Sequence, residues 1–405
     1  MVEQMKPSGI DWIGDIPESW KVTRLQTLFD QVKEKNSGTK EKNLLSLSYG
    51  KIVKKDIEGA LGLIPESFDT YNIIKKNDIV LRLTDMQNDQ VSLRTGLVKE
   101  ERGIITSAYV TVRLRFGSPS YYHWYLYAFD TSKQIYAFGQ GVRQSLTFEE
   151  LKKMLILLPS PKEQQAIADY LDKECAQIDS IAADLAKQIS LLQQYKKSLI
   201  TETVTKGLDK SVPMKDSGVE WIGEIPTHWD KKRMKYFLSV SSGEAITNDQ
   251  LEDGEYPVYG GGKQMGYFNK ANVDKNQILI GRVGANCGCV TITHTPSWAT
   301  DNALVVQTLC YFKYIYYILI SADLNRLNEA NAQPLITGAN VGNCVVPFTA
   351  NYTEQKQIAQ YLDERCEKIE GLIIGKQKQL ETIIQHKKSL IYEYVTGKKR
   401  VKEVQ

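Results

Sequence analysis

The chain has 405 residues, of which 42% are hydrophobic and 24% are charged, and its formal net charge is +3. This composition is typical of a globular chain of about two to four domains, and so small a net charge neither requires nor excludes a nucleic-acid partner. The sequence has no apolar run of 18 residues and no signal-peptide core near its start, so we expect no transmembrane helix and a cytoplasmic location.

Sequence signatures of catalysis and metal binding are missing. The six cysteines form no C-x-x-C pair, and Cys287-x-Cys289 with His294 lacks the spacing of a tetrahedral metal site. The stretch 260–264, GGGKQ, has neither the serine or threonine nor the leading spacing of a phosphate-binding loop. No G-x-S-x-G or H-E-x-x-H motif occurs, and the chain has only four histidines. We therefore expect free thiols, no metal site, no cofactor in this chain and no active site of its own.

One stretch occurs twice. Met5–Trp20 (MKPSGIDWIGDIPESW) matches Met214–Trp229 (MKDSGVEWIGEIPTHW) with an offset of 209. A second shared stretch, Glu163–Asp172 (EQQAIADYLD), matches Glu354–Asp363 (EQKQIAQYLD) with an offset of 191. The sequence therefore predicts two copies of one structural plan.

Residues 1–158 are predicted to form an arm followed by a mixed α/β domain. Glycines and a proline interrupt the apolar residues of the opening motif, which favours an irregular docked arm over a helix. Three β-rich runs bounded by turn residues follow at Asn43–Ser48, Asp78–Leu83 and Ile104–Leu114. The aromatic stretch Tyr121–Phe138 is predicted to be a helix that is buried on one side.

Residues 159–207 are predicted to form a long helix. Ser160, Pro161 and Glu163 make a capping box with proline at the first helical position. Apolar residues recur every seven positions, and Gly207 is a stop signal after a helix that ends near Thr205. A helix of this length is about 60 Å long and needs a partner along much of its length.

The second half repeats this order. Residues 208–350 are predicted to form a second arm and domain, and residues 351–405 a second helix, capped by Asn351 or Thr353 and ending near Thr396, with a solvated basic tail. Lys376 interrupts its apolar seam, which consists of Ile358, Leu362, Ile369, Leu372, Ile383 and Leu390.

The sequence thus predicts an α+β fold with two mixed α/β domains separated by two long antiparallel helices in a coiled-coil-like pair. The two copies would be related by an internal pseudo-two-fold axis near Ala183 and Ile374. The residues expected to hold this scaffold are Trp12, Trp20, Leu171, Ile178, Leu185, Leu192, Leu199, Trp221, Trp229, Leu362, Ile369 and Leu390.

Such a geometry predicts a protein that binds two DNA sites at a spacing set by the length of the helix pair. The major groove recurs about every 34 Å, so two domains on one rod are suited to two half-sites on the same duplex. The two domains differ in length by 18 residues, the difference between the two repeat offsets, so the half-sites would differ as well.

The paired motifs resemble those of a known family. Both arms read Trp-Ile-Gly-x-Ile-Pro-x-x-Trp, and both helices open with Glu-Gln and continue into Ile-Ala-x-Tyr-Leu-Asp. Over essentially its whole length the chain resembles the specificity subunits of type I restriction–modification enzymes. The second copy departs only at its cap, where Asn351-Tyr352-Thr353 replaces Ser160-Pro161-Lys162.

The resemblance implies a non-catalytic subunit with two target recognition domains that read a bipartite, asymmetric sequence in double-stranded DNA. It implies two methyltransferase (modification) subunits as partners, which use S-adenosylmethionine to methylate adenine, and motor-nuclease (restriction) subunits in the full complex. It implies no membrane partner.

Side-chain chemistry nominates residues for DNA contact, because arginine reads guanine, asparagine and glutamine read adenine, and lysine holds phosphates. In the first domain the candidates are Lys51, Arg82, Arg94, Arg143 and Gln144. In the second they are Tyr259, Lys263, Gln264, Arg282 and Asn286. Structural alternatives stay open, since Arg82 could form an ion pair within a strand and Gly260–Gly262 could be a tight hairpin.

Two other classes of function remain possible on the residues alone. One is a coiled-coil adaptor with two protein-recognition heads, which would show no salt-dependent binding to DNA. The other is an enzyme with an unrecognised active site, which would depend on S-adenosylmethionine or a metal ion in the isolated chain.

Overall fold

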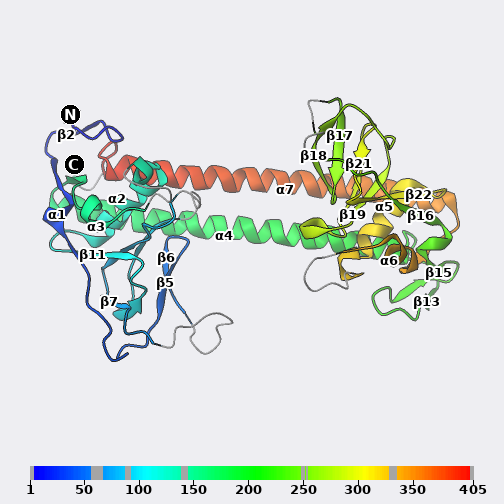
Figure 1. Cartoon of the computed structure of the whole chain (residues 1–405), viewed down its shortest axis with the longest axis horizontal. Helices are drawn as coiled ribbons and strands as arrows, with labels where there is room; N and C mark the ends of the chain where they lie inside the picture. Colours follow the sequence, from blue (N-terminus) through cyan, green and yellow to red (C-terminus); the bar gives the residue numbers. More distant parts are fainter. Residues whose placement is uncertain are drawn as a thin grey trace. The chain divides into compact units, whose positions relative to one another are not determined.

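The computed structural model describes residues 4–55, 67–86, 93–137, 145–247, 251, 254–327 and 335–401, and it divides into two compact units (Figure 1). Unit 1 comprises residues 1–185 and 378–405, and unit 2 comprises residues 186–377. The long helices α4 (Pro161–Lys206) and α7 (Tyr352–Val395) each contribute to both units. Across the described ranges, no helix is both long enough and apolar enough to span a membrane.

The ends of the first long helix are those that the sequence predicts. Ser160 and Glu163 form the expected capping box, in which the Ser160 amide donates to the Glu163 carboxylate (3.0 Å) and the Glu163 amide donates to the Ser160 hydroxyl (3.4 Å). Helix α4 ends at Lys206, and Gly207 follows with a φ of 70°.

The second long helix begins at an asparagine cap. The Asn351 side chain accepts hydrogen bonds from the backbone amides of Thr353 (3.0 Å) and Glu354 (3.3 Å), so Asn351 rather than Thr353 is the cap. Helix α7 ends at Val395, one residue before the predicted end.

The two long helices are antiparallel within each unit. In unit 1 the ammonium of Lys387 lies 2.6 Å from the Asp179 carboxylate. In unit 2 Lys196 pairs with Glu370 at 2.7 Å, and Lys376 donates to Gln188 at 2.5 Å. In both units, moving forward along α4 means moving backward along α7, as predicted.

The exact register differs from the prediction. An axis at Ala183 and Ile374 would place Gln188 opposite Ile369, but Gln188 pairs with Lys376. The predicted midpoint is therefore wrong by about one helical turn. Leu372 is a second error, because its side chain is exposed and the neighbouring Ile373 is buried in its place.

The predicted seam is buried best where a β-rich domain covers it. Leu171, Ile178, Leu362, Ile369 and Leu390 are buried. Leu185, Leu192 and Leu199 are only half-buried. Leu199 packs against the core of unit 2, whereas Leu185 and Leu192 belong to neither core, and a pair of helices alone does not enclose its seam.

Unit 1 is built around a four-stranded antiparallel sheet in the order β4-β11-β8-β9. Its strands are β1 (Met5–Pro7), β2 (Asp15–Pro17), β3 (Lys21–Arg24), β4 (Phe29–Gln31), β5 (Leu45–Ser48), β6 (Lys51–Lys54), β7 (Asn72–Lys75), β8 (Ile79–Leu81), β9 (Thr95–Leu97), β10 (Arg102–Ile105), β11 (Val110–Leu114) and β12 (Leu155–Leu158). Its short helices are α1 (Leu25–Leu28), α2 (Pro119–Thr131), η1 (Gln134–Ala137) and α3 (Phe148–Leu151).

Unit 2 repeats this sheet in the order β16-β22-β19-β20. Its strands are β13 (Met214–Asp216), β14 (Glu224–Pro226), β15 (Asp230–Arg233), β16 (Leu238–Ser242), β17 (Tyr256–Gly260), β18 (Lys263–Phe268), β19 (Ile278–Gly281), β20 (Val290–Ile292), β21 (Trp298–Ala299), β22 (Ala303–Thr308) and β23 (Val345–Phe348). Its short helices are η2 (Met234–Tyr236), η4 (Gly284–Asn286), α5 (Phe312–Ser321), η5 (Leu324–Leu327) and α6 (Gly338–Asn343).

Several local predictions need correction. The opening motif is a short hairpin rather than an irregular arm, because β1 pairs with β2 from Met5↔Pro17 to Pro7↔Asp15. The run Ile104–Leu114 is split into β10 and β11 by a turn at Thr106, whose carbonyl accepts from the Tyr109 amide. The helix predicted over Tyr121–Phe138 ends at Thr131, because Lys133 adopts a φ of 63°, and Phe138 lies outside the described residues.

The basic tail is also docked rather than solvated over the part that the structure describes. Lys398 donates to the Asp15 carbonyl at 2.5 Å, and Arg400 forms an ion pair with Glu163. The end of α7 is therefore fixed to the opening motif, while residues 402–405 lie outside the described residues.

Candidate nucleic-acid interface

The shared Glu-Gln…Asp stretch attaches each β-rich domain to its long helix. In unit 1 the Gln164 side chain accepts from the Ser118 amide (3.0 Å), just before α2, and Asp172 accepts from the Trp124 indole (2.7 Å) and the Ser120 hydroxyl (2.9 Å). These bonds hold α2, the buried helix of the domain, against α4.

Unit 2 uses the same positions with different partners. Gln355 accepts from the Tyr311 amide (3.0 Å), and Asp363 binds the Tyr317 hydroxyl (2.9 Å) and the Lys313 ammonium (2.5 Å). Gln164 and Asp172 in unit 1, and Gln355 and Asp363 in unit 2, therefore attach a domain to a long helix in the same way. This shared role explains why the stretch repeats.

The glutamate of the same stretch binds the tryptophan of the opening motif. The Trp20 indole donates to Glu163 at 3.1 Å, and the Trp229 indole donates to Glu354 at 3.0 Å. Burial of Glu163 favours its neutral form, but hydrogen bonds from Ser160 and Trp20 outweigh that effect and lower its pKa. The motif therefore anchors the start of the long helix of its own copy.

Each opening motif also covers the end of the other long helix. Gly397 lies against Pro17 and Trp20 in unit 1, and Gly207 lies against Trp229 in unit 2. Trp20 and Trp229 are fully buried, while Trp12 and Trp221 are half-buried. Trp12 contacts the rings of Tyr125, Phe129 and Tyr392, and Trp221 lies under the guanidinium of Arg326.

Each domain carries a β-hairpin, called its ribbon, at the same place in its chain order, and in unit 2 the hairpin strand β17 also pairs with β21. In unit 1, β5 pairs with β6 and ends at Ser48↔Lys51. In unit 2, β17 pairs with β18 and ends at Gly260↔Lys263. Lys51, Lys263 and Gln264, three of the predicted DNA contacts, are exposed at or beside these ribbon tips. The tight hairpin that was the structural alternative for Gly260–Gly262 is present.

The remaining predicted contacts of unit 2 lie around the same tip. Both the Gly261 amide (3.1 Å) and the Arg282 amide (3.0 Å) donate to the Asn302 carbonyl, so the ribbon and the end of β19 share one anchor. The Arg282 guanidinium donates to the Ser242 hydroxyl (3.2 Å), and its Nε atom is buried and has no hydrogen-bond partner in the part of the chain that the structure describes. Tyr259, Arg282 and Asn286 are half-buried. The structure thus brings the five predicted residues of unit 2 to one end of the domain.

Unit 1 does not gather its predicted residues as well. Arg94 is fully buried, and its guanidinium donates to the carbonyl oxygens of Arg82 (3.2 Å), Thr84 (3.0 Å) and Asp85 (3.3 Å). The prediction of a DNA contact at Arg94 is therefore wrong for this structure, in which Arg94 ties together the backbone after β8. Arg82 is half-buried beside it, and Arg143 and Gln144 lie outside the described residues.

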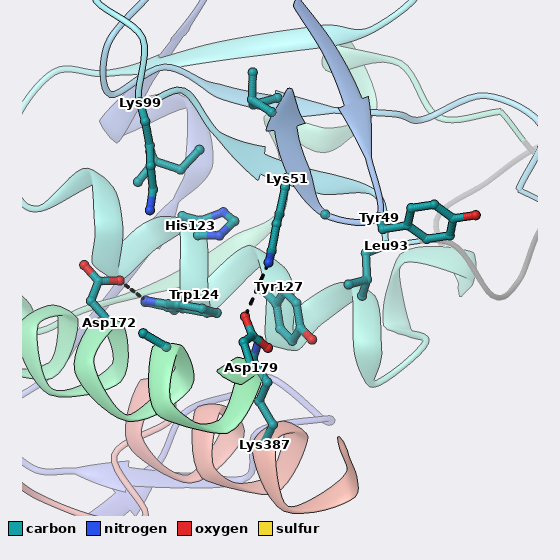
Figure 2. Close-up of a pocket in the computed structure, with 14 residues that line it drawn as sticks. Tyr49, Lys51, Leu93, Lys99, His123, Trp124, Tyr127, Asp172, Asp179 and Lys387 are labelled. Carbon is teal, nitrogen blue, oxygen red and sulfur yellow. Dashed lines mark hydrogen bonds and ion pairs between the residues drawn. The ribbon is translucent and has the colours of Figure 1, made fainter. Parts of the chain in front are cut away.

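A cleft of about 530 Å³ lies beside the ribbon of unit 1 (Figure 2). Figure 2 shows Lys51 pointing from the ribbon toward Asp179 on α4, with Lys387 of α7 on the far side of that carboxylate. Lys51 lies 3.7 Å from Asp179 and Lys387 lies 2.6 Å from it. This ion triad connects the ribbon with both long helices inside unit 1.

The back of the cleft holds the buried His123. Its Nδ1 atom has no hydrogen-bond partner among the described residues, and burial lowers the pKa of its ring to about 3, helped by the nearby charges of Lys99 and Lys387. A histidine that stays neutral beside two ammonium groups does not add to the positive charge of the cleft. Among the described residues, no cluster of histidine, cysteine, aspartate and glutamate could hold a metal ion.

Comparison with known proteins assigns the fold to a family. The family model of the type I restriction modification DNA specificity domain matches the chain twice, over residues 17–191 and 226–382. The chain therefore belongs to this family. Its two copies are DNA-target recognition domains, and the chain is a non-catalytic specificity subunit of a type I restriction–modification system.

Full-length relatives agree in length and in kind. The chain is 26% identical to the MjaX specificity subunit and 23% identical to the MjaVIII specificity subunit of type I restriction enzymes of Methanocaldococcus jannaschii; the first match covers 96% of each chain, and the second covers 96% of this chain and 95% of the relative. The EcoprrI specificity subunit of Escherichia coli is 28% identical over 54% of each chain.

One solved structure shares the fold of the whole chain. It comes from work on complex assembly and conformational transition of the type I R-M system, with a TM-score of 0.69 at 13% identity, and the match covers 94% of this chain and 98% of that chain.

Proposed function

We propose that the two recognition domains read the two halves of a bipartite, asymmetric DNA target, one half-site each. The observation that carries this proposal is the contrast between the attachments and the ribbon tips. The same Glu-Gln…Asp residues fix both domains to α4 and α7, while the exposed residues around β5–β6 and β17–β18 differ. Two domains that are attached in the same way but expose different residues are suited to a target with two different half-sites.

We also propose that the helix pair sets the spacer between the half-sites. Both long helices are continuous and contribute to both units, so a change in helix length changes the connection between the two domains. Removing residues 183–189 and the equivalent 374–380 deletes one heptad from each helix and keeps Asp179, Glu370 and the exposed Ile181 and Leu372. The recognised spacer should then change, with both half-sites kept. An unchanged spacer would contradict the proposal that the helix pair sets the distance between the half-sites.

The partners proposed from the family are two methyltransferase subunits, which use S-adenosylmethionine, and motor-nuclease subunits. A feature of the helices supports a partner present twice: Ile181 on α4 and Leu372 on α7 occupy equivalent positions and are 48% and 56% exposed. Apolar side chains exposed at both repeats suit one docking surface used twice. Replacing both residues with glutamate should reduce the number of methyltransferase subunits that co-purify, without unfolding the chain. Unchanged stoichiometry would place the docking surface elsewhere.

The most direct test of recognition is methylome sequencing of cells that express this chain with its methyltransferase subunit. A methylated motif with two specific halves and a fixed spacer is expected. Methylation at a single undivided motif would contradict the bipartite proposal, and methylation without sequence preference would contradict recognition by this chain. Salt-dependent DNA binding by the purified chain would exclude an adaptor that binds only protein.

A further inference from the structure

The tip of the unit 1 ribbon carries an aromatic residue in an unfavourable backbone conformation. The register Ser48↔Lys51 leaves Tyr49 and Gly50 as a two-residue turn, with φ values of 47° and 74°. Two-residue hairpins commonly have positive φ at both turn residues, and asparagine or aspartate followed by glycine is the preferred pair. Gly50 fits this pattern, but a bulky residue such as Tyr49 seldom adopts positive φ.

Among the residues that the structure describes, no contact of the Tyr49 side chain offsets the cost of this conformation. The Tyr49 side chain is 84% exposed, and it forms no hydrogen bond or ring contact with the described residues. The turn itself is firmly held: a Cβ at Gly50 would lie 2.9 Å from Leu93, and Gly96 lies directly beneath Leu47 and Ile52. Backbone strain that no internal contact explains is found most often where a residue serves binding.

The equivalent ribbon of unit 2 shows which part of the tip is shared. There, Gly261 and Gly262 form the two-residue turn, with φ values of 56° and 88°, and Lys263 follows. Both ribbons therefore end in glycine and then an exposed lysine, while the first turn residue is Tyr49 in one unit and Gly261 in the other. The shared lysine is suited to contact a phosphate, which is present in every DNA sequence. The residue that differs between the units is suited to contact bases, which carry the sequence information.

We propose that the Tyr49 ring contacts base edges in the half-site read by unit 1, which makes it a specificity-determining residue of this domain. A two-stranded ribbon fits the major groove, where an aromatic ring can pack on the thymine methyl group and a hydroxyl can bond to base edges. On the strand that follows the turn, Lys54 is exposed and suits a phosphate, while Lys51 is exposed but pairs with Asp179 across the cleft. The inference rests on the proposed function, because it assumes that unit 1 reads one half-site.

Tyr49→Gly tests the inference without a folding penalty. Glycine is suited to positive φ, and the variant tip would match that of unit 2, so the thermal stability of the chain should stay the same or rise. The probe is a random-sequence duplex library, from which the chain in complex with its methyltransferase subunit selects binders. Base preference should fall about tenfold at one to three positions of one half-site, and the other half-site should be unchanged.

Two further variants sharpen the result. Tyr49→Phe keeps the ring and removes the hydroxyl, so retained preference assigns the contact to the ring and lost preference assigns it to the hydroxyl; both support the proposal. Phe116→Gly removes another exposed aromatic of unit 1, on the turn between β11 and α2, and should leave selection unchanged. Identical selection by wild type and Tyr49→Gly, or an equal loss at both half-sites, would overturn the inference alone. Selection of no sequence by the wild type would overturn the proposed function and the inference with it.

Discussion

The two units are alike where they meet the long helices and unlike where they end in solvent. Glu163, Gln164 and Asp172 bind the arm and domain of unit 1 at the positions where Glu354, Gln355 and Asp363 bind those of unit 2, although the partners of the two aspartates differ in residue type. The repeated residues are thus bonded inside the protein. In this stretch, the residues that both copies share therefore attach the domains to the long helices.

The unlike positions extend into the domain cores. The residue before the aspartate-bound Trp124 is His123, and the residue before the equivalent Tyr317 is Tyr316. A buried arginine, Arg94, crosslinks the backbone of unit 1, while unit 2 ties its ribbon and β19 to the Asn302 carbonyl. The same order of strands is therefore compatible with different buried contacts in the two units.

The largest expected difference concerns the two glycines that end the long helices. A Cβ at Gly397 would lie 2.5 Å from Pro17 Cδ, whereas a Cβ at Gly207 would lie 3.4 Å from Trp229 Cζ2, and both residues have positive φ. Gly207→Ala should cost about 1–2 kcal/mol from backbone strain alone. Gly397→Ala adds overpacking, so its total cost should be about 2–5 kcal/mol. Urea unfolding of the two purified variants measures the difference. Equal losses would show that Pro17 moves aside and that the first arm is not tightly packed.

The sequence predicts these helix ends well because the signals are local. Ser160, Glu163 and Gly207 specify the limits of α4 within a few residues of the chain, and Asn351 does the same for α7. The seam was harder, since spacings of three and four residues both fit one face of a helix, and only packing selects Ile373 over Leu372.

The candidate site was predicted only in part, for a different reason. Lys51, Lys263 and Gln264 are polar residues near turn signals, which predict the exposed positions that these side chains occupy. Arg94 has the same chemistry but is buried by residues distant in the chain, which no local pattern reveals. Tyr49 was missed because tyrosine is not a turn residue. The available signal was the parallel between Tyr49-Gly50-Lys51 and Gly261-Gly262-Lys263, each between two β-rich runs.

The two units should also differ in how their stability depends on pH. The pKa of His123 is lowered from 6.5 to about 3, so between these two pH values the unfolded chain binds a proton at His123 and the folded chain does not. Unit 1 should therefore lose stability as the pH falls from about 6.5 toward 3, by at most about 1.4 kcal/mol per pH unit from this residue. Tyr316, at the equivalent position, binds no proton in this range.

The variant His123→Gln isolates this effect. Lys99 and Lys387 face the ring, and Asp172 and Asp179 line the same cleft, so the measurement compares the wild type with the variant at each pH. The difference in unfolding free energy should shrink steadily from pH 7 to pH 4. A difference that does not depend on pH would mean that His123 is protonated in the folded protein or is reached by water.

The smallest expected difference lies in the two ion pairs between the long helices. Asp179 and Glu370 are equivalent, and their partners Lys387 and Lys196 have side chains that are 14% and 32% exposed. Glu370→Gln should cost less than about 0.5 kcal/mol, because a solvent-exposed pair contributes little. Asp179→Asn should cost about 1 kcal/mol, since it leaves the better-buried Lys387 without an anion and also releases Lys51 from the ribbon side.

Urea unfolding at about 0.1 M and 1 M salt separates the two cases, because salt screens exposed charges more than buried ones. The Glu370→Gln effect should vanish at high salt and part of the Asp179→Asn effect should remain. If both effects vanish together, the ion triad of unit 1 is as exposed as the pair in unit 2, and the ribbon is not held to the helices through Asp179.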